Sequence, residues 1–518
     1  MDVVVVGAGI GGLSVARELL GRRHIRSVRV LEANDRVGGR IRTTYDADGR
    51  PLYECGAWRI PEAHTRVLGL CRELGLELLP VASEAPEARR GWLGPRQECA
   101  RRGGPGPGGA YGAAAATLSD WDELAARDGI CAAELATAKT GYAGLDVMAL
   151  GTDAYGVHEL QRPARFFVPA RGLSSICEAL AREVAAAGAS VVLKARVVDV
   201  VREADGYRVT SHVRTGANAF RCVACRADIV VLAVPPRSLE AMPGLCEPLA
   251  PILAAVQSVS LVKLFSEAGP DIERLLGLDG SYHFKSDTLA QQLISNTYPG
   301  TNLVQLAYAA GRRADALERL RLGGDLLSVV AGELGDLRSS CQDCARALRA
   351  ALLAKPHHVH YWRDAVHVWL PSFDLDVERK SHEACVLPHL LRLPNLYLCG
   401  EALSTVQGWS EGALRTARDV LRAIAATLDY FDRHGRLPPP GQVPRLLNVQ
   451  SGTAMHRVIY DGRLLDVGAW LKVHPGTPAA IQAHLGEDVT ELFRAMAHPR
   501  YALGFLFALQ VGWLLPVG

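Results

Sequence analysis

The chain has 518 residues, of which 49% are hydrophobic and 22% charged, and its formal net charge is +2. This length exceeds what one compact core accommodates, so two or three domains are expected. A nearly neutral charge excludes a dedicated nucleic-acid binder, and the scattered cysteines indicate a reduced, cytoplasmic protein rather than a disulfide framework. The apolar N-terminal run lacks the basic region and the cleavage site of a signal peptide.

The first residues follow the pattern of a nucleotide-binding strand–turn–helix unit. A β-branched run at 3–6 leads into a turn that contains Gly7, Gly9 and Gly12, and a helical pattern follows at 13–20. Gly7 permits the tight turn, Gly9 lets the backbone approach a pyrophosphate, and Gly12 allows the helix to pack closely on the strand. An ordinary glycine-rich turn is the alternative, but the flanking elements favour a Rossmann-type dinucleotide site.

The next segment narrows the dinucleotide to FAD. A second strand pattern ends on Glu32, where a carboxylate can bind ribose hydroxyls. Residues 32–40 read E-A-x-x-R-x-G-G-R and resemble the flavin amine oxidase superfamily. Gly39 gives close backbone approach in such a segment, and Arg36 and Arg40 are available to the pyrophosphate. The resemblance therefore implies FAD as the cofactor.

Two side chains are candidates for substrate binding. Arg59 lies between Trp58 and Ile60, and its planar fork can bind a carboxylate with two bonds. Its segment resembles the G-A-M-R-I-P segment of L-amino-acid oxidases, which implies that Arg59 holds the substrate carboxylate; an arginine that reaches solvent from a half-buried turn is the alternative. The strand pattern ending at Tyr308 resembles one whose tyrosine shares this carboxylate, although Tyr308 could equally belong to the core.

A lysine in an apolar run is a third candidate. Lysine is rare in this arginine-rich chain, yet Lys263 lies within the strand-like stretch 260–265. A buried ammonium is costly, and lysine can lose its charge where arginine cannot. In amine oxidases the matching lysine holds a water at the flavin N5, and the resemblance implies this role for Lys263. An edge-strand lysine that reaches solvent is the alternative.

The segment 395–413 resembles the C-terminal signature of the same superfamily. The resemblance assigns Gly400 and Glu401 to the ribityl and pyrophosphate groups of FAD. It assigns Trp409 to the wall of the substrate site. It also implies that Gly412 lets a helix begin against the isoalloxazine.

Two further segments bear on how FAD is held. Val197 matches a residue whose main chain contacts adenine in the family. The aromatic pattern at 360–369 resembles a strand in which covalently flavinylated monoamine oxidases carry a cysteine. No cysteine occurs between Val366 and Ser372, so the FAD should be bound non-covalently.

The middle of the chain is less informative. Residues 84–118 have too little apolar content to pack and are expected to form a mobile surface excursion. Tyr142 and His158 lie in short stretches that resemble bacterial L-tryptophan oxidases. These two residues could line the substrate pocket, but a structural histidine is equally compatible with the sequence.

These motifs predict an α/β fold in which a Rossmann-type FAD-binding domain is interleaved with an α+β substrate domain over residues 1–430. The expected boundaries are about 1–80, 165–240 and 390–430 for the FAD-binding domain, 81–164 and 241–389 for the substrate domain, 431–450 for a proline-rich linker, and 451–518 for a small α+β module.

The small module resembles cytochrome b5. His474 and His498 lie 24 positions apart, in segments similar to the two haem-ligating segments of that family, and Trp470 and Phe493 also fit its pattern. Two neutral imidazoles can ligate an iron on both faces while apolar side chains bury the porphyrin. The resemblance implies haem b with His474 and His498 as iron ligands. A helical tail with chance histidines is the alternative.

The C-terminal apolar stretch and the two C-x-x-C pairs are interpreted as structural features without a functional role. The apolar stretch 502–518 is too short to span a membrane and is expected to close the small module as a helix and a strand. Membrane association is therefore not expected, with a membrane-surface or partner contact as the alternative. The C-x-x-C pairs at 222–225 and 341–344 lie far apart and are interpreted as incidental thiols rather than a zinc site.

The sequence as a whole predicts an enzyme that uses FAD to oxidise an L-amino acid to an imine and a 2-oxo acid. Electrons would pass to oxygen, to an electron-transfer partner or to the fused haem module. One alternative is a polyamine or other amine oxidase, or a desaturase, of the same superfamily. Another is a non-catalytic electron-transfer or docking protein. A homodimer is compatible with the sequence.

Overall fold

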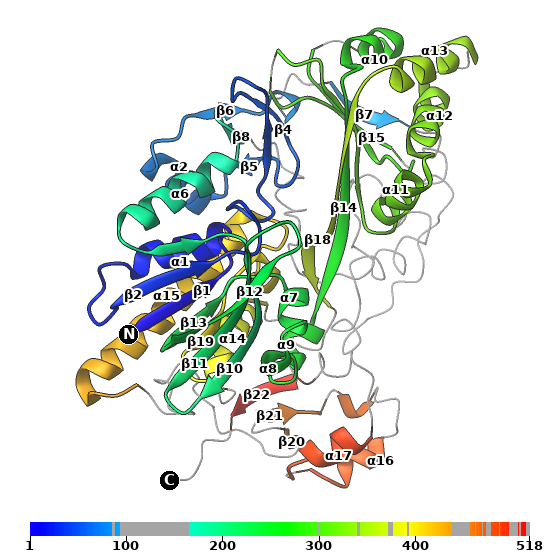
Figure 1. Cartoon of the computed structure of the whole chain (residues 1–518). Helices are drawn as coiled ribbons and strands as arrows, with labels where there is room; N and C mark the ends of the chain where they lie inside the picture. Colours follow the sequence, from blue (N-terminus) through cyan, green and yellow to red (C-terminus); the bar gives the residue numbers. More distant parts are fainter. Residues whose placement is uncertain are drawn as a thin grey trace.

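The computed structural model describes residues 1–84, 89–93, 165–437, 456–496, 506 and 509–513. Short gaps within these ranges lie at 279, 287, 299, 339–341, 371–376, 391–392, 461–462, 469, 473–477 and 486. Figure 1 shows three groups of elements, built around a parallel sheet, a larger and mostly antiparallel sheet and a small C-terminal sheet.

A five-stranded parallel sheet forms the first group, in the order β19-β13-β1-β2-β9. Its central strand β1 buries Val3 to Val6, as an apolar run covered on both faces should. Val3 pairs with Val28 of β2 on one side and with Ile229 of β13 on the other. The strands span β1 Asp2–Val6, β2 Ser27–Leu31, β9 Ser190–Val192, β13 Ile229–Leu232 and β19 Leu396–Leu398.

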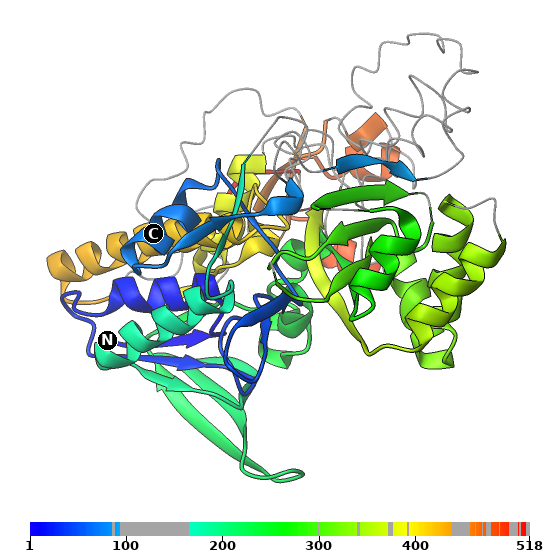
Figure 2. The same ribbon diagram turned by 90° about the horizontal axis from the view of Figure 1, so that it is seen from above.

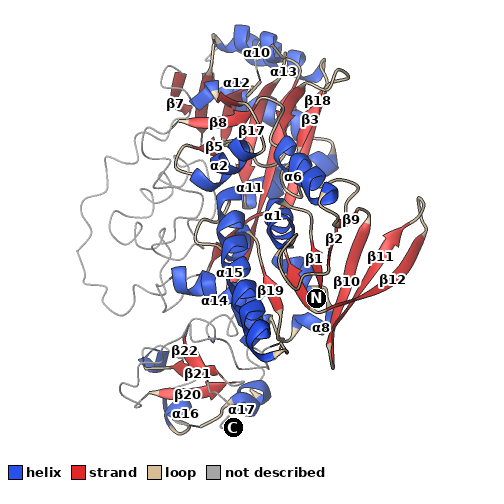
Figure 3. Cartoon of the chain, turned by 90° about the vertical axis from the view of Figure 1, so that its left-hand side faces the viewer, coloured by secondary structure: helices blue, strands red, loops and turns tan. Residues whose placement is uncertain are grey.

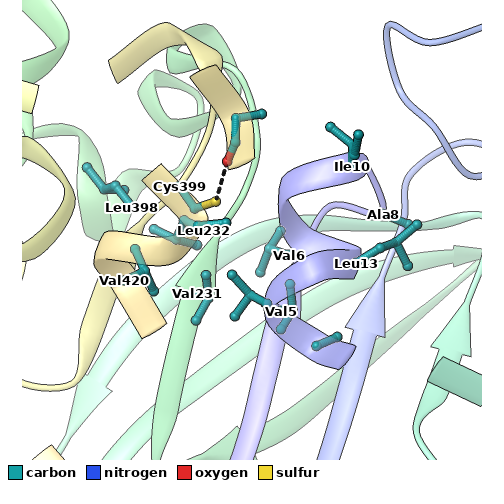
Figure 4. Packing of buried hydrophobic residues seen from close by; sticks show 14 of the residues in the cluster. Val5, Val6, Ala8, Ile10, Leu13, Val231, Leu232, Leu398, Cys399 and Val420 are labelled. Atoms are coloured by element: carbon teal, nitrogen blue, oxygen red, sulfur yellow. Dashed lines mark hydrogen bonds between the residues drawn. The ribbon is translucent and has the colours of Figure 1, made fainter. Parts of the chain in front are cut away.

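Helices cover one face of this sheet and a second sheet lies on the other (Figure 2). The helices are α1 Ile10–Leu19, α6 Ser174–Ala186 and α15 Ser410–His434. Figure 4 shows Val5, Val6 and Val231 of the strands beside Leu13 of α1 and Val420. The antiparallel sheet opposite contains β10 Ala195–Glu203, β11 Gly206–Arg214 and β12 Phe220–Ala227. This arrangement confirms the predicted α/β fold with a Rossmann-type sheet.

A six-stranded sheet in the order β18-β14-β17-β16-β15-β7 forms the second group. Its long strands β14 and β18 run side by side in Figure 1, and four helices share a separate hydrophobic core with the sheet. The elements are β7 Arg89–Leu93, β14 Val256–Ser266, β15 Tyr282–Ser286, β16 Gln292–Ser295, β17 Val304–Ala310, β18 His357–Trp369, α10 Gly269–Leu276, α11 Arg312–Gly323, α12 Leu326–Arg338 and α13 Gln342–Leu353.

Strand β7 corrects part of the sequence prediction. Residues 84–118 were expected to form a surface excursion, but Arg89–Leu93 pairs in parallel with β15 at the edge of the six-stranded sheet. Edge pairing uses backbone groups and needs few apolar side chains, so the low apolar content of the stretch did not reveal it. Residues 85–88 and 94–118, together with Tyr142 and His158, lie outside the described residues.

Short elements connect these two groups. Two small sheets, β3-β4 and β5-β8-β6, and the helix α2 lie near their junction (Figure 1). The bounds are β3 Thr43–Tyr45, β4 Pro51–Glu54, β5 Ile60–Pro61, α2 Thr65–Glu73, β6 Leu78–Pro80, η1 Ala82–Glu84, β8 Phe166–Pro169, α7 Pro236–Glu240, α8 Pro243–Cys246, α9 Ala250–Ala254, α14 Val377–Leu390 and η5 Glu401–Leu403.

The C-terminal group lies at one end of the molecule in Figure 3. Its antiparallel sheet has the order β20-β21-β22, and its described core includes Val458, Leu465 and Leu471. Strand β22 agrees with the prediction that the apolar C-terminal stretch closes the module with a strand. The bounds are β20 Arg457–Tyr460, β21 Arg463–Asp466, η6 Trp470–Lys472, α16 Pro478–Gln482, α17 Thr490–Ala495 and β22 Gln510–Trp513.

Candidate active site

A cavity of about 1090 Å³ lies where the parallel sheet meets the six-stranded sheet. The carboxyl ends of β1 and β2 open into it, as is usual for ligand sites on parallel sheets. Most of the predicted site residues line it: Gly7, Gly9, Gly12, Glu32, Arg36, Gly39, Arg40, Arg59, Val197, Tyr308, Gly400, Glu401 and Trp409. Residues that are far apart in the chain therefore share one site.

The glycines of the first turn serve different steric purposes. Gly7 has a φ of +103°, and a Cβ on Gly12 would lie 2.2 Å from the Gly7 carbonyl oxygen. These two positions must lack a side chain for α1 to approach β1. A Cβ on Gly9, Gly39 or Gly400 would meet nothing within 4 Å, although all three line the cavity. Their bare backbone therefore leaves room for an elongated ligand against the chain, as a dinucleotide requires.

Glu32 presents a fixed carboxylate at the end of β2. The residue is 5% exposed, and its Oε2 accepts a hydrogen bond of 2.8 Å from the amide of Ala8 in the glycine turn. Its Oε1 accepts bonds from the backbone and side-chain amides of Asn34. These donors orient the carboxylate beside the turn before any ligand binds. The position is the one that the ribose-binding prediction requires.

Arg36 and Arg40 differ in what they contact. Arg36 donates to the carbonyl oxygens of Val37, Gly39 and Ile41, so its guanidinium stabilises its own glycine loop. Burial lowers the pKa of Arg36 from its ordinary value. Both arginines were predicted to contact the pyrophosphate. In this structure Arg36 contacts its own glycine loop, and this loop would in turn approach the pyrophosphate.

Arg40, which is partly exposed, forms an ion pair with the buried Glu401. Arg40 Nη1 donates to Glu401 Oε2, and the Glu401 carboxylate also accepts from the amides of His367 and Gly408 and from His367 Nδ1. Burial opposes ionisation of Glu401, yet Arg40 and His367 hold the pKa of its carboxyl well below the ordinary value. The pair is therefore charged, and it fixes the β18 backbone to the loop that follows β19. His367 was not identified from the sequence.

Arg59 lies in the cavity wall between two aromatic rings. Its guanidinium carbon is 4.1 Å from the centroid of the Trp58 ring and 4.3 Å from that of Phe166. Trp58 is itself fixed, because its Nε1 donates a 2.7 Å hydrogen bond to Thr297 Oγ1. Arg59 is 6% exposed, which excludes the alternative of an arginine reaching solvent. The stacking holds the planar fork in one orientation.

Aromatic side chains continue this wall. Tyr308, on β17, lies with its ring centroid 6.0 Å from that of Trp58. Trp409, immediately before α15, meets the His64 ring edge to face at 4.9 Å. His64 lines the cavity and is 2% exposed, and burial lowers its pKa to about 4, so the imidazole is neutral at pH 7. His64 was not predicted from the sequence, although it follows Arg59 by only five residues.

Lys263 is fully buried on β14, which excludes an edge lysine reaching solvent. Its ammonium donates to the carbonyl oxygens of Glu54, at 3.0 Å, and Gly56, at 2.6 Å. Burial lowers its pKa from the ordinary value, against the attraction of the Glu54 carboxylate. In this structure Lys263 holds the segment that leads to Arg59, while Gly56 of that segment lines the cavity. The predicted contact with a water at the flavin stays a prediction.

The cysteine pairs do not form a metal site in the described part of the chain. Cys222 and Cys225 lie on β12, where an odd offset places their side chains on opposite faces of the strand. The side chains of Cys341 and Cys344 lie outside the described residues. Among the residues that the structure describes, no group of three or more His, Cys, Asp and Glu side chains could hold a metal ion.

The predicted haem ligands His474 and His498 also lie outside the described residues. Among the described residues of this module, Ile481 and Phe493 pack partly buried against the core of the small sheet. Leu492 and Met496, on and just after α17, are 42% and 64% exposed.

Comparison with models of protein families identifies the family of the chain that forms this cavity. The model of the flavin-containing amine oxidoreductases matches residues 10–101 and 109–424. The chain belongs to this family. The match begins within the glycine turn, at residue 10, and covers the arginine loop and the segment before α15, so a flavin is the ligand that the family implies for the cavity.

A second family model matches the C-terminal part of this amine oxidoreductase. The cytochrome b5-like haem/steroid-binding domain matches residues 453–515. The match confirms the predicted fusion of a flavin amine oxidoreductase with a cytochrome b5-like domain. No helix among the described residues has the length and apolar character needed to cross a membrane.

Individual relatives share short stretches of sequence with this amine oxidoreductase. The L-amino-acid oxidase of Echis ocellatus is 45% identical over 91 residues, which are 18% of this chain and 17% of that protein. The L-amino-acid oxidase of Mus musculus is 47% identical over 76 residues, which are 15% of this chain and 12% of that protein. The alignments thus span less than a fifth of these relatives.

Solved structures share the fold over most of the chain. A variant of putrescine oxidase has a TM-score of 0.60 at 18% identity, covering 82% of this chain and 99% of that one. Cyclohexylamine oxidase from Brevibacterium oxydans has a TM-score of 0.58 at 18% identity, covering 83% of this chain and 99% of that one. At these identities the likeness supports the fold and leaves the substrate open.

Proposed function

We propose that this protein is an FAD-dependent oxidase of an L-α-amino acid, which it converts to an imine that hydrolyses to a 2-oxo acid and ammonia. The observation that carries the proposal is the placement of Arg59. Its guanidinium lies in the wall of the flavin cavity, stacked between the rings of Trp58 and Phe166. A fixed cationic fork in an apolar wall suits a substrate that carries a carboxylate, whereas a simple amine gains nothing from it.

FAD fits the residues that line the cavity. The bare backbones of Gly9, Gly39 and Gly400 would receive the pyrophosphate and ribityl chain, the Glu32 carboxylate the ribose, and the backbone of Val197 the adenine. A bound flavin supplies the acceptor for the two electrons and the hydrogen that leave the substrate carbon. Its attachment would be non-covalent.

The protein's own contribution is to bind and orient the substrate. Arg59 and Tyr308 would hold the carboxylate. Trp409 would form another wall of the substrate site and exclude water. Fixing the substrate at its carboxylate restricts its remaining motion to the Cα and the side chain, and such positioning is a large part of the reduction in the reaction barrier. Lys263 would contribute by fixing the segment before Arg59 and by holding a water at the flavin.

The chain would then comprise an oxidase unit over residues 1–430, a linker at 431–450 and a haem b unit at 451–518, with His474 and His498 as the iron ligands. Helix α15 continues to His434, so its last turn overlaps the start of the proposed linker. Gly435 ends the helix with a φ of +66°. The electron acceptor would be oxygen, an electron-transfer partner or the haem unit.

A substrate screen of the purified protein tests the proposal. The panel contains the twenty L-amino acids together with putrescine and cyclohexylamine, and anaerobic bleaching of the flavin absorbance and release of ammonia are measured. We expect bleaching by at least one amino acid and little or none by putrescine and cyclohexylamine, which lack a carboxylate. Bleaching by amines alone would replace the amino-acid assignment with the amine oxidase alternative. A protein that binds no flavin would support the non-catalytic alternative.

A further inference from the structure

The first turns of α2 and α15 meet at one buried carboxylate, that of Glu411. The Glu411 side chain is 1% exposed. Its Oε2 accepts hydrogen bonds of 3.1 Å from the backbone amides of Arg66 and Val67, and its Oε1 accepts one of 3.1 Å from Arg66 Nη1. Arg415 Nε lies 3.9 Å from the same Oε1. A residue on α15 thus binds the free amides of α2, a helix of nine residues.

This contact supplies what α2 lacks. The residue at its N-cap position is His64, whose side chain makes no capping hydrogen bond. The first turn of a helix exposes unbonded N–H groups and a partial positive charge, and a carboxylate stabilises both. Glu411 lies in the first turn of α15 as well. One negative charge therefore lies between two positive helix ends and two guanidinium groups, which would otherwise repel one another.

The residues that flank this contact form the proposed substrate end of the cavity. Trp409 lies two positions before Glu411, and His64 directly precedes α2. Their rings touch edge to face at 4.9 Å, and both line the cavity. Upstream, the short strand β5 joins Arg59 to His64, and Ile60 of β5 pairs with Phe167 of β8. The position of α2 is thus coupled through a short, paired segment to that of Arg59.

We propose that Glu411 is a positioning residue for the substrate. It holds the segment that carries Arg59 and His64 at a fixed separation from Trp409, and so sets the width of the substrate end. The proposal rests on the proposed function, since it assumes that this end of the cavity receives the substrate. The glycine turn, Glu32 and Val197 lie on other elements, so most of the contacts expected to hold the ribose, pyrophosphate and adenine of FAD do not involve the segment around Glu411.

The test compares Glu411→Gln with the parent and with the control Glu73→Gln. Glutamine keeps one carbonyl oxygen but replaces the other with an NH2 group, so either the α2 amides or Arg66 Nη1 would face a donor instead of an acceptor. Glu73 is a matched control because it ends the same helix, has a side chain 62% exposed and binds Arg17 at 2.9 Å. The measurements are the FAD content, the Kd of benzoate from the shift in flavin absorbance, and KM and kcat for the best amino acid.

For Glu411→Gln we expect benzoate Kd and KM to rise together by about tenfold or more, because a buried acceptor of charge-assisted bonds is lost. The value of kcat should change much less, and FAD content should match the parent. Glu411→Asp keeps the charge on a shorter stem and should show an intermediate rise. Glu73→Gln should leave all four quantities unchanged. Unchanged Kd and KM in Glu411→Gln, with FAD retained, would overturn the proposal.

Two other outcomes are also decisive. If the parent binds no benzoate and oxidises only amines, the amino-acid assignment fails, and Glu411 is then judged by KM for the best amine. The same rise is expected there, because the wall formed by Trp409 and His64 is displaced whatever the substrate. If both Glu411 variants lose FAD or fail to fold, Glu411 supports the whole domain rather than the substrate end, and the proposal is wrong.

Discussion

Replacing Arg59 with methionine separates its charge from its packing. In the structure the guanidinium stacks between Trp58 and Phe166, and Trp58 is independently fixed by Thr297. Methionine has a similar unbranched stem, and its thioether also packs favourably on aromatic rings. Arg59→Met should therefore leave the wall in place while it removes the carboxylate-binding fork.

The expected cost follows from the bonds that the fork would make. A hydrogen bond to a charged group contributes about 1.5–3 kcal/mol. Since about 1.4 kcal/mol corresponds to tenfold, kcat/KM for an amino acid should fall roughly 10- to 150-fold in Arg59→Met. The FAD content should not change, because Arg59 is not part of the glycine turn or of the Glu32 and Glu401 contacts.

The assay is steady-state oxidation of the best amino acid, with flavin absorbance as the measure of cofactor content. The decarboxylated amine of that amino acid is the control substrate, since Arg59→Met should not weaken whatever slow oxidation the parent shows with it. Unchanged kcat/KM for the amino acid in a variant with full FAD content would refute the assignment of Arg59 to the substrate carboxylate.

Four further predictions concern stability and the cofactors. Burial depresses the pKa of His64 from 6.5 to about 4, so between these pH values the unfolded chain binds more protons and the free energy of unfolding falls as the pH falls. Between pH 7 and pH 5, urea unfolding should show that the free energy of unfolding of His64→Phe falls by about 2 kcal/mol less than that of the parent. An equal fall in both proteins would contradict this. Glu401→Gln should weaken FAD binding severalfold in equilibrium dialysis, because Arg40 loses its charged partner; unaltered affinity would argue against a role for the pair. Acid precipitation should leave all FAD in the supernatant, whereas yellow protein would reveal a covalent bond. The parent should bind haem with a Soret band that His474→Ala lacks at unchanged FAD content, and a parent without haem would remove the haem assignment.

Local sequence patterns predicted the parts of the site that are formed by residues close together in the chain. The turn with Gly7 and Gly12 and the strand ending at Glu32 were predictable, because strand period, turn sterics and helix onset are each set within a few residues. The burial of Val3 to Val6 followed from an apolar run in a parallel strand. Arg59 and Lys263 were recognisable because a cation in an apolar stretch is unusual.

The conformation of the chain, which the motifs do not specify, decides what each cation contacts. Arg36 could serve a phosphate or its own loop, and the local turn at residues 37–41 directs it to the loop carbonyls. Lys263 could hold a water or bind the main chain, and only the approach of β14 to residues 54–56 supplies its two acceptors. Local sequence fixes which groups a side chain offers, but not which partners come within reach.

The sequence by itself therefore determined the fold, the flavin-binding segments and the fused b5-like module, because these depend on short-range periodicity and on motifs with fixed spacing. The tertiary structure decided the pairing of Glu401 with Arg40, the contact of His64 with Trp409 and the capping of α2 by Glu411. Each of these joins residues more than 340 positions apart. Such pairings arise only when packing of the hydrophobic core brings distant segments together, and hydrogen-bond geometry then selects the partners.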